Sequence, residues 1–207
     1  MDAIPKSGFY LPNNIVRITL LTLEEVMGKN GLNAILNMAC LPERVEAYPP
    51  DNWDREFDFA DFSAIQNALQ EMYGKRSGRG LAVRCGRAIF AAALRDKGPL
   101  AGIRSPEFQA LPLERRLWIG LSALARVSTQ ASDLIVTVEE QEEYLAYTIR
   151  RCPVCWGQHT EEPACYVMLG LLLEGLQRIS GGHELQVVQQ TARSMGAITC
   201  DFFVYKR

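Results

Sequence analysis

Cysteine is the residue type whose spacing in this chain most clearly suggests chemistry. Cys152 and Cys155 have two residues between them, which lets two thiolates from one tight turn bind one tetrahedral ion at about 2.3 Å. Cys165 follows ten residues later, and Cys200 begins an expected strand. A hairpin-like arrangement can bring these four sulfurs together, with His159 as a substitute ligand. Zn²⁺ is the metal that such a soft set of donors favours.

The sequence carries no motif of a nucleotide-dependent enzyme. It has no Gly-x-Gly-x-x-Gly after a strand, no Gly-x-x-x-x-Gly-Lys loop and no Gly-x-Ser-x-Gly elbow. The two histidines, His159 and His183, lie in polar loops beside glycines, where exposure to solvent is expected rather than general base catalysis. The sequence therefore favours a binding protein, and we assign no catalytic residue.

Composition predicts one globular domain over residues 1–207, with residues 1–12 as an N-terminal tail. Hydrophobic residues make up 48% and charged residues 22% of the chain. The net charge of -2, from 22 basic and 24 acidic residues, argues against nucleic acid as a partner. No apolar run approaches the ~18 residues of a membrane span, and no leader peptide is evident, so we expect a cytoplasmic protein.

The first part of the chain has helical periodicity. The pattern predicts helices from Thr22, capped by Thr22 and Glu25, and then over residues 32–40, 61–73, 81–94 and 113–128. Asp61 or Ser63 is the expected cap of the third helix. Glycines at 28 and 74 should end helices, Gly86 should mark close packing or a bend, and residues 48–59 should form an extended connector. We expect residues 113–128 to be mostly buried.

The second part changes in character. Residues 134–138 and 143–149 are rich in β-branched and aromatic side chains and predict a hairpin. A helix over 166–179 and strands over 184–191 and 200–205 follow. Helices followed by strand, strand, helix, strand, strand is an α+β order. Cys40 and Cys85 fall within apolar helical patterns and are expected to be buried.

Several motifs together resemble the 4-vinyl reductase (hydrocarbon-binding) domain family over about residues 13–207. They are residues 152–157 (CPVCWG), 163–166 (PACY), 170–176 (GLLLEGL), Gly196, 200–202 (CDF) and, upstream, 80–90 (GLAVRCGRAIF). The resemblance implies helices packed on an antiparallel sheet of about four to five strands. That fold is shared with nitric-oxide-sensing haem domains and TRAPP vesicle-tethering subunits. It also implies an enclosed apolar pocket and a homodimer.

Members of this family differ in function. They include aromatic-hydrocarbon sensor domains of transcription regulators and a tetrapyrrole-binding accessory protein of bacteriochlorophyll synthesis. The resemblance therefore implies that this chain senses or carries a hydrophobic, aromatic or tetrapyrrole ligand. Since no DNA-binding or ATPase segment is evident, we expect that any signalling passes through a partner protein. The alternatives are a structural homodimer with a vestigial pocket, or an accessory role in 4-vinyl reduction.

The resemblance also bears on the cysteines. In the aromatic-sensor branch, zinc is held by a cysteine that starts the long helix, a Glu-x-x-Cys pair, and a cysteine eight residues later. Cys165 and Cys200 match the first and last of these positions, whereas Gln189 and Ala192 stand at the middle two. Three alternatives stay open: Cys152 and Cys155 replace the missing pair, the metal site is lost, or the cysteines form a redox disulfide.

A pocket of this kind would be lined by apolar and aromatic side chains. For each candidate, packing in the core is the simpler interpretation, and only the resemblance argues for a cavity. The candidates are Trp118, Phe90, Met72, Tyr147, Trp156 and Met168.

Overall fold

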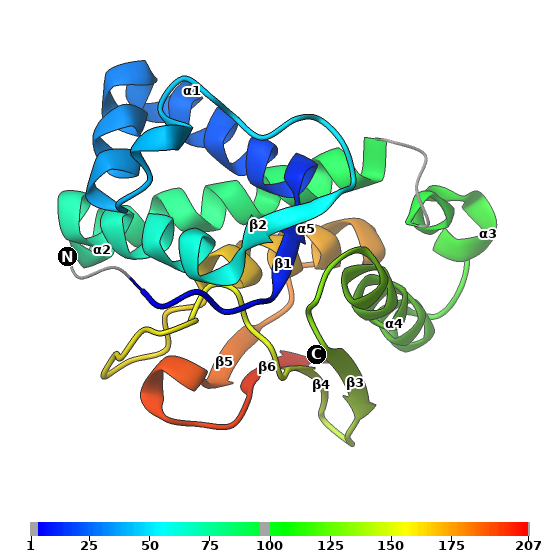
Figure 1. The fold of residues 1–207 in the computed structure, drawn as a ribbon. Coiled ribbons are helices and arrows are strands. Elements are labelled where there is room, and N and C mark those ends of the chain that lie inside the picture. The colour runs from blue at the N-terminus through cyan, green and yellow to red at the C-terminus, as the bar shows by residue number, and fades with distance from the viewer. Residues whose placement is uncertain (1–3, 96–99, 207) are drawn as a thin grey trace.

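The computed structural model describes residues 4–95 and 100–206, and it has an α+β architecture (Figure 1). Three helices, α1, α2 and α5, lie together above an antiparallel sheet, and α4 lies beside them. The principal helices are α1 (Asn13–Met38), α2 (Phe59–Arg95), α4 (Leu113–Ala131) and α5 (Tyr166–Ile179). The short helical segments are η1 (Pro42–Arg44), η2 (Ala101–Arg104), α3 (Pro106–Gln109) and η3 (Arg193–Met195).

The main sheet has four antiparallel strands in the order β3-β4-β6-β5. Its strands are β3 (Val136–Glu140), β4 (Tyr144–Ile149), β5 (Val187–Thr191) and β6 (Cys200–Tyr205). A separate two-stranded ribbon pairs β1 (Tyr10–Pro12) with β2 (Arg55–Asp58). The expected fold of helices on an antiparallel sheet of about four strands is confirmed, as is the hairpin of β3 and β4.

Alternation along the central strands defines the face of the sheet that packs on the helices. In β4 the side chains of Leu145, Tyr147 and Ile149 are buried, while the residues between them are partly exposed. In β6 the buried set begins with Cys200, which is paired with Ile149. The register therefore points Cys200 inward at the point where β4 ends.

Two glycines allow α2 and α5 to cross in direct backbone contact. A Cβ atom at Gly86 would lie 1.9 Å from the carbonyl oxygen of Val167, and one at Gly170 would lie 2.0 Å from that of Val83. Both distances are far shorter than any real contact, so neither position accepts a side chain. The prediction of close packing at Gly86 is confirmed, and the helix does not bend there.

The beginning of α1 differs from the sequence prediction. The helix starts at Asn13, and Thr22 lies inside it, where its hydroxyl donates a hydrogen bond to the carbonyl of Ile18. Val16 and Leu20 are fully buried at helical spacing, so packing of this face outweighs the weak helix preference of the β-branched residues around them. The capping box at Thr22 was therefore wrong. Residues 10–12, which we assigned to a tail, form strand β1.

The prediction that glycines interrupt α1 and α2 is confirmed in part. Gly28 (φ 74°, ψ 166°) and Gly74 (φ 75°, ψ 161°) both take left-handed conformations that kink their helices. The helical turn resumes directly after Gly74, however, and continues through Gly78 and Gly80, which lie between the two helices expected over residues 61–73 and 81–94. Helical packing of the following segment against α5 overrides the low propensity of glycine.

Three further predictions in this half of the chain were wrong. The carboxylate of Asp58, rather than Asp61 or Ser63, accepts the 2.7 Å hydrogen bond from the N–H of Ala60 at the start of α2. The expected connector contains strand β2, because pairing with β1 satisfies its backbone. Helix α4 is buried on one face only, with Ile119 38% exposed.

The two cysteines outside the C-terminal group, Cys40 and Cys85, differ in burial. Cys85 is fully buried in α2, as expected, and burial raises the pKa of its thiol to about 12. Cys40 is exposed, contrary to the prediction, and takes a positive φ of 59°. It follows the last turn of α1, where the chain reverses direction, so its side chain leaves the apolar face.

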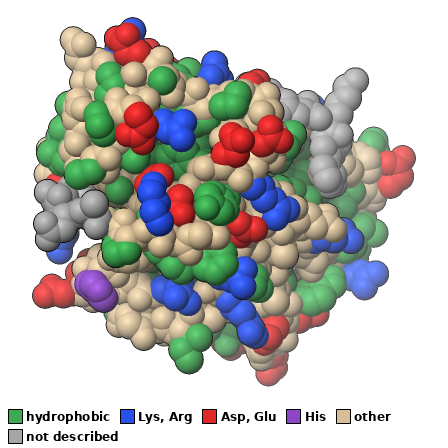
Figure 2. Space-filling view, in the orientation of Figure 1, with side chains coloured by type: hydrophobic (Ala, Val, Ile, Leu, Met, Phe, Trp, Pro, Cys, Tyr) green, Lys and Arg blue, Asp and Glu red, His purple; other side chains and the backbone are tan. Residues whose placement is uncertain are grey.

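Acidic and basic side chains are interspersed over the face of the molecule in Figure 2. Some pair across elements that are distant in sequence, as Lys6 does with Asp61 and Arg55 with Asp133. Within residues 4–95 and 100–206, no helix is both long and apolar enough to cross a membrane.

Candidate metal centre and ligand cavity

The four C-terminal cysteines converge from three parts of the fold. Cys152 and Cys155 lie in the loop after β4, Cys165 immediately precedes α5, and Cys200 begins β6. Because Ile149 pairs with Cys200, the loop that leaves β4 starts beside the first sulfur of β6. All four side chains are buried, and their sulfurs lie within 4.8 Å of one another.

The separations between the sulfur atoms resemble the edges of a tetrahedron. Cys152 Sγ lies 3.8 Å from Cys155 Sγ and 3.6 Å from Cys165 Sγ, and Cys200 Sγ lies 3.6 Å and 3.5 Å from the same two atoms. Four thiolates at ~2.3 Å from one Zn²⁺ ion would be about 3.8 Å apart. Cys155 and Cys165 are instead joined as a disulfide, with Cα atoms 6.3 Å apart.

The surroundings make the four sulfurs unequal. A hydrogen bond from Cys152 lowers the pKa of Cys200, and the backbone N–H of Arg193, 3.3 Å from the sulfur, acts in the same direction. The same contact with Cys200, together with burial, raises the pKa of Cys152. Cys200 is therefore the sulfur best prepared to carry negative charge. His159 is exposed and does not belong to the group.

The Cys152–Cys155 turn is attached to α2 by a buried hydrogen-bond network. The Ser63 hydroxyl donates to the carbonyl of Val154 (3.1 Å). The Gln158 amide donates to that carbonyl (3.1 Å) and to the Ser63 hydroxyl (2.8 Å). Ser63 and Gln158 are both buried, so each bond is protected from competition with water. The network fixes the peptide between the two cysteines.

The positions that differ from the aromatic-sensor pattern have structural roles here. Gln189 lies on β5, and its side-chain oxygen accepts a 3.2 Å hydrogen bond from the backbone N–H of Cys165. Ala192 is fully buried. The structure brings Cys152 and Cys155 to Cys165 and Cys200, the arrangement required if the CxxC pair takes the place of the missing ligands.

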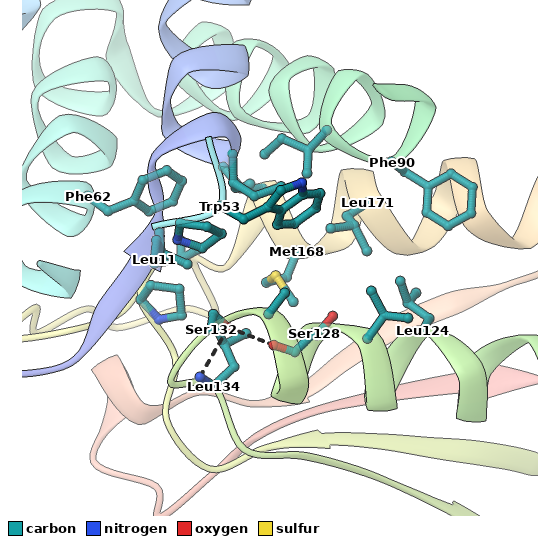
Figure 3. Close-up of a pocket in the computed structure, with 18 of the residues that line it drawn as sticks. Leu11, Trp53, Phe62, Phe90, Leu124, Ser128, Ser132, Leu134, Met168 and Leu171 are labelled. Carbon is teal, nitrogen blue, oxygen red and sulfur yellow. Dashed lines mark hydrogen bonds between the residues drawn. The ribbon is translucent and has the colours of Figure 1, made fainter. Parts of the chain in front are cut away.

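A second feature is an apolar cavity of about 90 Å³ (Figure 3). It is lined by strand β1, the starts of α1 and α5, both halves of α2, the C-terminal half of α4 and four connecting segments. Its lining consists of Leu11, Pro12, Ile15, Trp53, Phe62, Ile89, Phe90, Leu100, Leu124, Val127, Ser128, Ala131, Ser132, Leu134, Pro153, Val154, Val167, Met168 and Leu171.

The cavity offers a ligand very few polar partners. Ser128 and Ser132 are the polar residues in its lining. The Ser132 hydroxyl is used locally, since it donates to the carbonyl of Ser128 (2.7 Å) and accepts from the N–H of Leu134 (3.2 Å). The Ser128 hydroxyl lies beside the buried phenol of Tyr147, whose pKa burial raises and this hydroxyl lowers in part. An uncharged, apolar ligand is the type that this lining accommodates.

The candidate ligand residues are distributed over the molecule. Phe90 and Met168 line the cavity. Met72 and Trp118 are partly buried against the core, and Tyr147 is fully buried between the sheet and the helices. Trp156 packs edge-on against Phe9 and Phe59, and Arg193 lies over its ring.

Sequence reasoning missed Trp53, which lies over the cavity in Figure 3. The available signal was a large aromatic side chain in a polar connector, between Asn52 and Asp54. The sequence could not indicate what that side chain covers.

The two features share a wall. Pro153 and Val154, the residues between Cys152 and Cys155, line the cavity. Val167 and Met168, which follow Cys165 in the first turn of α5, line it as well. The segments that carry three of the four sulfurs therefore also shape the cavity.

Comparison with known proteins identifies the fold. No family model and no curated protein matches the sequence. The unliganded Fe(II) H-NOX protein from K. algicida matches with a TM-score of 0.57 and 14% identity, over 95% of this chain and 97% of that one. The Fe(II)NO H-NOX protein from S. oneidensis matches with a TM-score of 0.54 and 13% identity, over 91% and 97%.

A third structure, from work on haem redox potential and porphyrin distortion, has a TM-score of 0.55 and 16% identity over 94% of this chain and 99% of that one. At such identities the likeness concerns the arrangement of the backbone, not the ligand. The protein therefore has the H-NOX fold, which agrees with the nitric-oxide-sensing haem fold that the family resemblance implied.

Proposed function

We propose that this protein is a small-molecule-binding domain that takes a small, uncharged apolar or aromatic ligand in the cavity beneath Trp53 and holds a structural zinc ion at its four cysteines. The apolar cavity carries the first part of the proposal, since its lining leaves a ligand almost no hydrogen-bonding partner. The resemblance to the 4-vinyl reductase family supports the same function, acting as a sensor or carrier.

Haem is the first ligand to consider, because the fold is that of H-NOX proteins. Haem iron needs an axial ligand, such as His, Cys or Tyr, sometimes with Met. The residues that line the cavity include only Met168 from this group, and both histidines of the chain are exposed. The volume of about 90 Å³ is smaller than the ~150 Å³ of a cavity that binds benzene. Haem and other tetrapyrroles do not fit this site.

That mismatch favours a sensor or carrier of small hydrocarbons over an accessory role in bacteriochlorophyll synthesis. A ligand of about one aromatic ring matches the scale of the cavity far better than a macrocycle.

The four cysteines fit zinc by type and by geometry. All four donors are buried sulfurs, four of their separations are 3.5–3.8 Å, and among the described residues no acidic side chain belongs to the group. Separation of Cys155 from Cys165 on reduction would complete a set of four thiolates. Zn²⁺ bound there would join the loop after β4, the start of α5 and the start of β6.

A ligand titration tests the first part of the proposal. We expect benzene to raise the melting temperature of the wild-type protein in a concentration-dependent way. At 100 times its Kd, benzene should increase the free energy of unfolding by about 2.7 kcal/mol. Ala131→Leu fills part of the cavity and should abolish the effect. Gln130→Leu, at an exposed position on the same helix, is the matched control and should retain it.

Two outcomes would contradict cavity binding. Equal stabilisation of the Ala131→Leu protein would place benzene elsewhere. No stabilisation of any of the three proteins would reject the small-ligand function and favour the structural homodimer.

Native mass spectrometry of protein purified under reducing conditions, without added metal, tests the second part. We expect a mass excess of one zinc ion per chain that disappears under denaturing conditions. A metal-free chain with an intact Cys155–Cys165 disulfide would reject the zinc centre. The same spectrum reports whether the protein is a dimer.

A further inference from the structure

Trp53 combines two properties that rarely occur together. Its indole lines the apolar cavity, yet the residue is 52% exposed to solvent. Tryptophan is normally highly buried, because its ring contributes a large apolar surface. In Figure 3 the indole lies over the space between Phe62, Met168 and Leu171. One face of the ring therefore meets the cavity, while the rest of the side chain meets water.

The backbone that carries Trp53 is fixed on both sides. The carbonyl of Asn52 accepts the N–H of Asn14 (3.0 Å), and the carbonyl of Asp54 accepts the N–H of Asn13 (2.9 Å). The side-chain amide of Asn13 also donates to the side-chain oxygen of Asn52 (3.0 Å). These bonds satisfy the first two N–H groups of α1, which have no partner within the helix. Movement of the turn would expose them, so the turn stays in place.

Because the turn stays in place, a side chain of the lining must move before the cavity can accept a ligand as large as benzene. The space of about 90 Å³ beneath the indole is smaller than the ~150 Å³ cavity that binds benzene. Most of the lining is packed within helices in the core, where a change of conformation is costly. The indole of Trp53 is the large lining side chain with solvent on one side. Its rotation about χ1 and χ2 breaks no hydrogen bond that the structure contains among the described residues.

We propose that Trp53 is the cover and size filter of the ligand cavity: its indole rotates on a fixed turn to admit an apolar ligand and then closes against it. This inference rests on the proposed ligand-binding function. It assigns a role in ligand specificity to the side chain of Trp53. The protein would select aromatic ligands by the number of fused or substituted rings that fit beneath the indole. An aromatic ligand gains an additional ring contact from the closed cover.

The test compares benzene with naphthalene on three proteins. Wild type should bind benzene at least about tenfold more tightly than naphthalene, since the second ring prevents closure. Trp53→Ala should bring the two affinities within about threefold and release benzene about tenfold faster. Trp118→Phe, a change on α4 outside the cavity lining, is the control and should preserve the wild-type preference.

The ratio of the two affinities carries the conclusion, because it is independent of any general change in binding strength. An unchanged ratio and an unchanged benzene release rate in Trp53→Ala would overturn the cover, while leaving ligand binding itself intact. Absence of binding to wild type and Trp53→Ala alike would instead reject the ligand-binding function, and the cover with it.

A fluorescence measurement gives a second readout. In the double variant Trp118→Phe, Trp156→Phe, Trp53 is the single tryptophan of the chain. Benzene bound beneath the ring should change its quenching by acrylamide, because the space under the indole is too small for benzene unless the ring moves. Unchanged quenching at saturating benzene would contradict movement of the cover. Since Trp53 is exposed, we expect Trp53→Ala to fold, and its melting temperature verifies this.

Discussion

The cysteine centre and the apolar cavity lie side by side, but the chain builds them in different ways. The centre uses four side chains of one type from the last 56 residues of the chain, all pointing to one position. The cavity uses residues from Leu11 to Leu171, contributed by four helices, strand β1 and the loops between them. A cluster of identical donors depends on every member, whereas a distributed lining tolerates change at most positions and depends on how its helices cross.

Removal of two of the four cysteines should have the largest effect on the free energy of unfolding of any change in this comparison. With Cys152 and Cys155 both replaced by serine, we expect a loss of several kcal/mol in the free energy of unfolding, because a structural metal contributes its binding energy to folding. Chemical denaturation under reducing conditions measures the loss. Cys40→Ser, at an exposed position, is the control. A double variant as stable as that control would show that the centre does not support the fold.

The stability of the protein should be most sensitive, around the cavity, at the helix crossing that shapes it. Gly86→Ala places a Cβ atom against the backbone of α5 and should destabilise the protein by about 3 kcal/mol. Gly80→Ala, six residues earlier on the same helix with open space around it, should instead stabilise by about 0.5–1 kcal/mol. Equal unfolding midpoints for the two variants would contradict the backbone contact.

A smaller effect is expected at Asp58, which attaches the segment before β1 to α2. Burial raises the pKa of this carboxyl group, but hydrogen bonds donated by Ser7, Ala60 and Gly8 outweigh burial, and the net pKa is lowered. The stabilisation is therefore complete above the unfolded pKa of about 3.9 and is lost as the pH falls through the folded value.

Asp58→Asn should accordingly cost about 1 kcal/mol at pH 7, the typical contribution of a helix cap. The difference from wild type should shrink in acid, as urea unfolding at a series of pH values would reveal. Asp51→Asn, at an exposed position in the connector, should show no such dependence. A cost that stays constant down to the acid limit would mean that the charge of Asp58 is not involved.

The contrast between the two regions also explains what the sequence could predict. The spacing of Cys152 and Cys155 is a local signal, and the strands on either side of it followed from alternation, so a cluster of four cysteines was foreseeable. The helix over residues 166–179 followed from the same kind of pattern. Local periodicity failed at Thr22, where buried contacts with α2 extend α1 toward its N-terminus.

The cavity had no local signal. Phe90 and Met168 were proposed for it, but Tyr147 and Trp118 have the same kind of pattern and pack elsewhere. Whether an apolar side chain fills the core or borders a void depends on how α2 and α5 cross, and Gly86 indicated close packing but not the partner helix or the geometry of the crossing. Trp53 was hidden for a related reason, because its position depends on hydrogen bonds to the start of α1.

The wall formed by Pro153 and Val154 belongs to both regions at once, and this has a thermodynamic consequence. A ligand that prefers one shape of this peptide shifts the affinity of the sulfurs for their ion by some factor. Reciprocity requires the ion to shift the affinity for that ligand by the same factor. Availability of metal in the surroundings would then set the concentration of hydrocarbon to which the protein responds, and one chain would report on both quantities together.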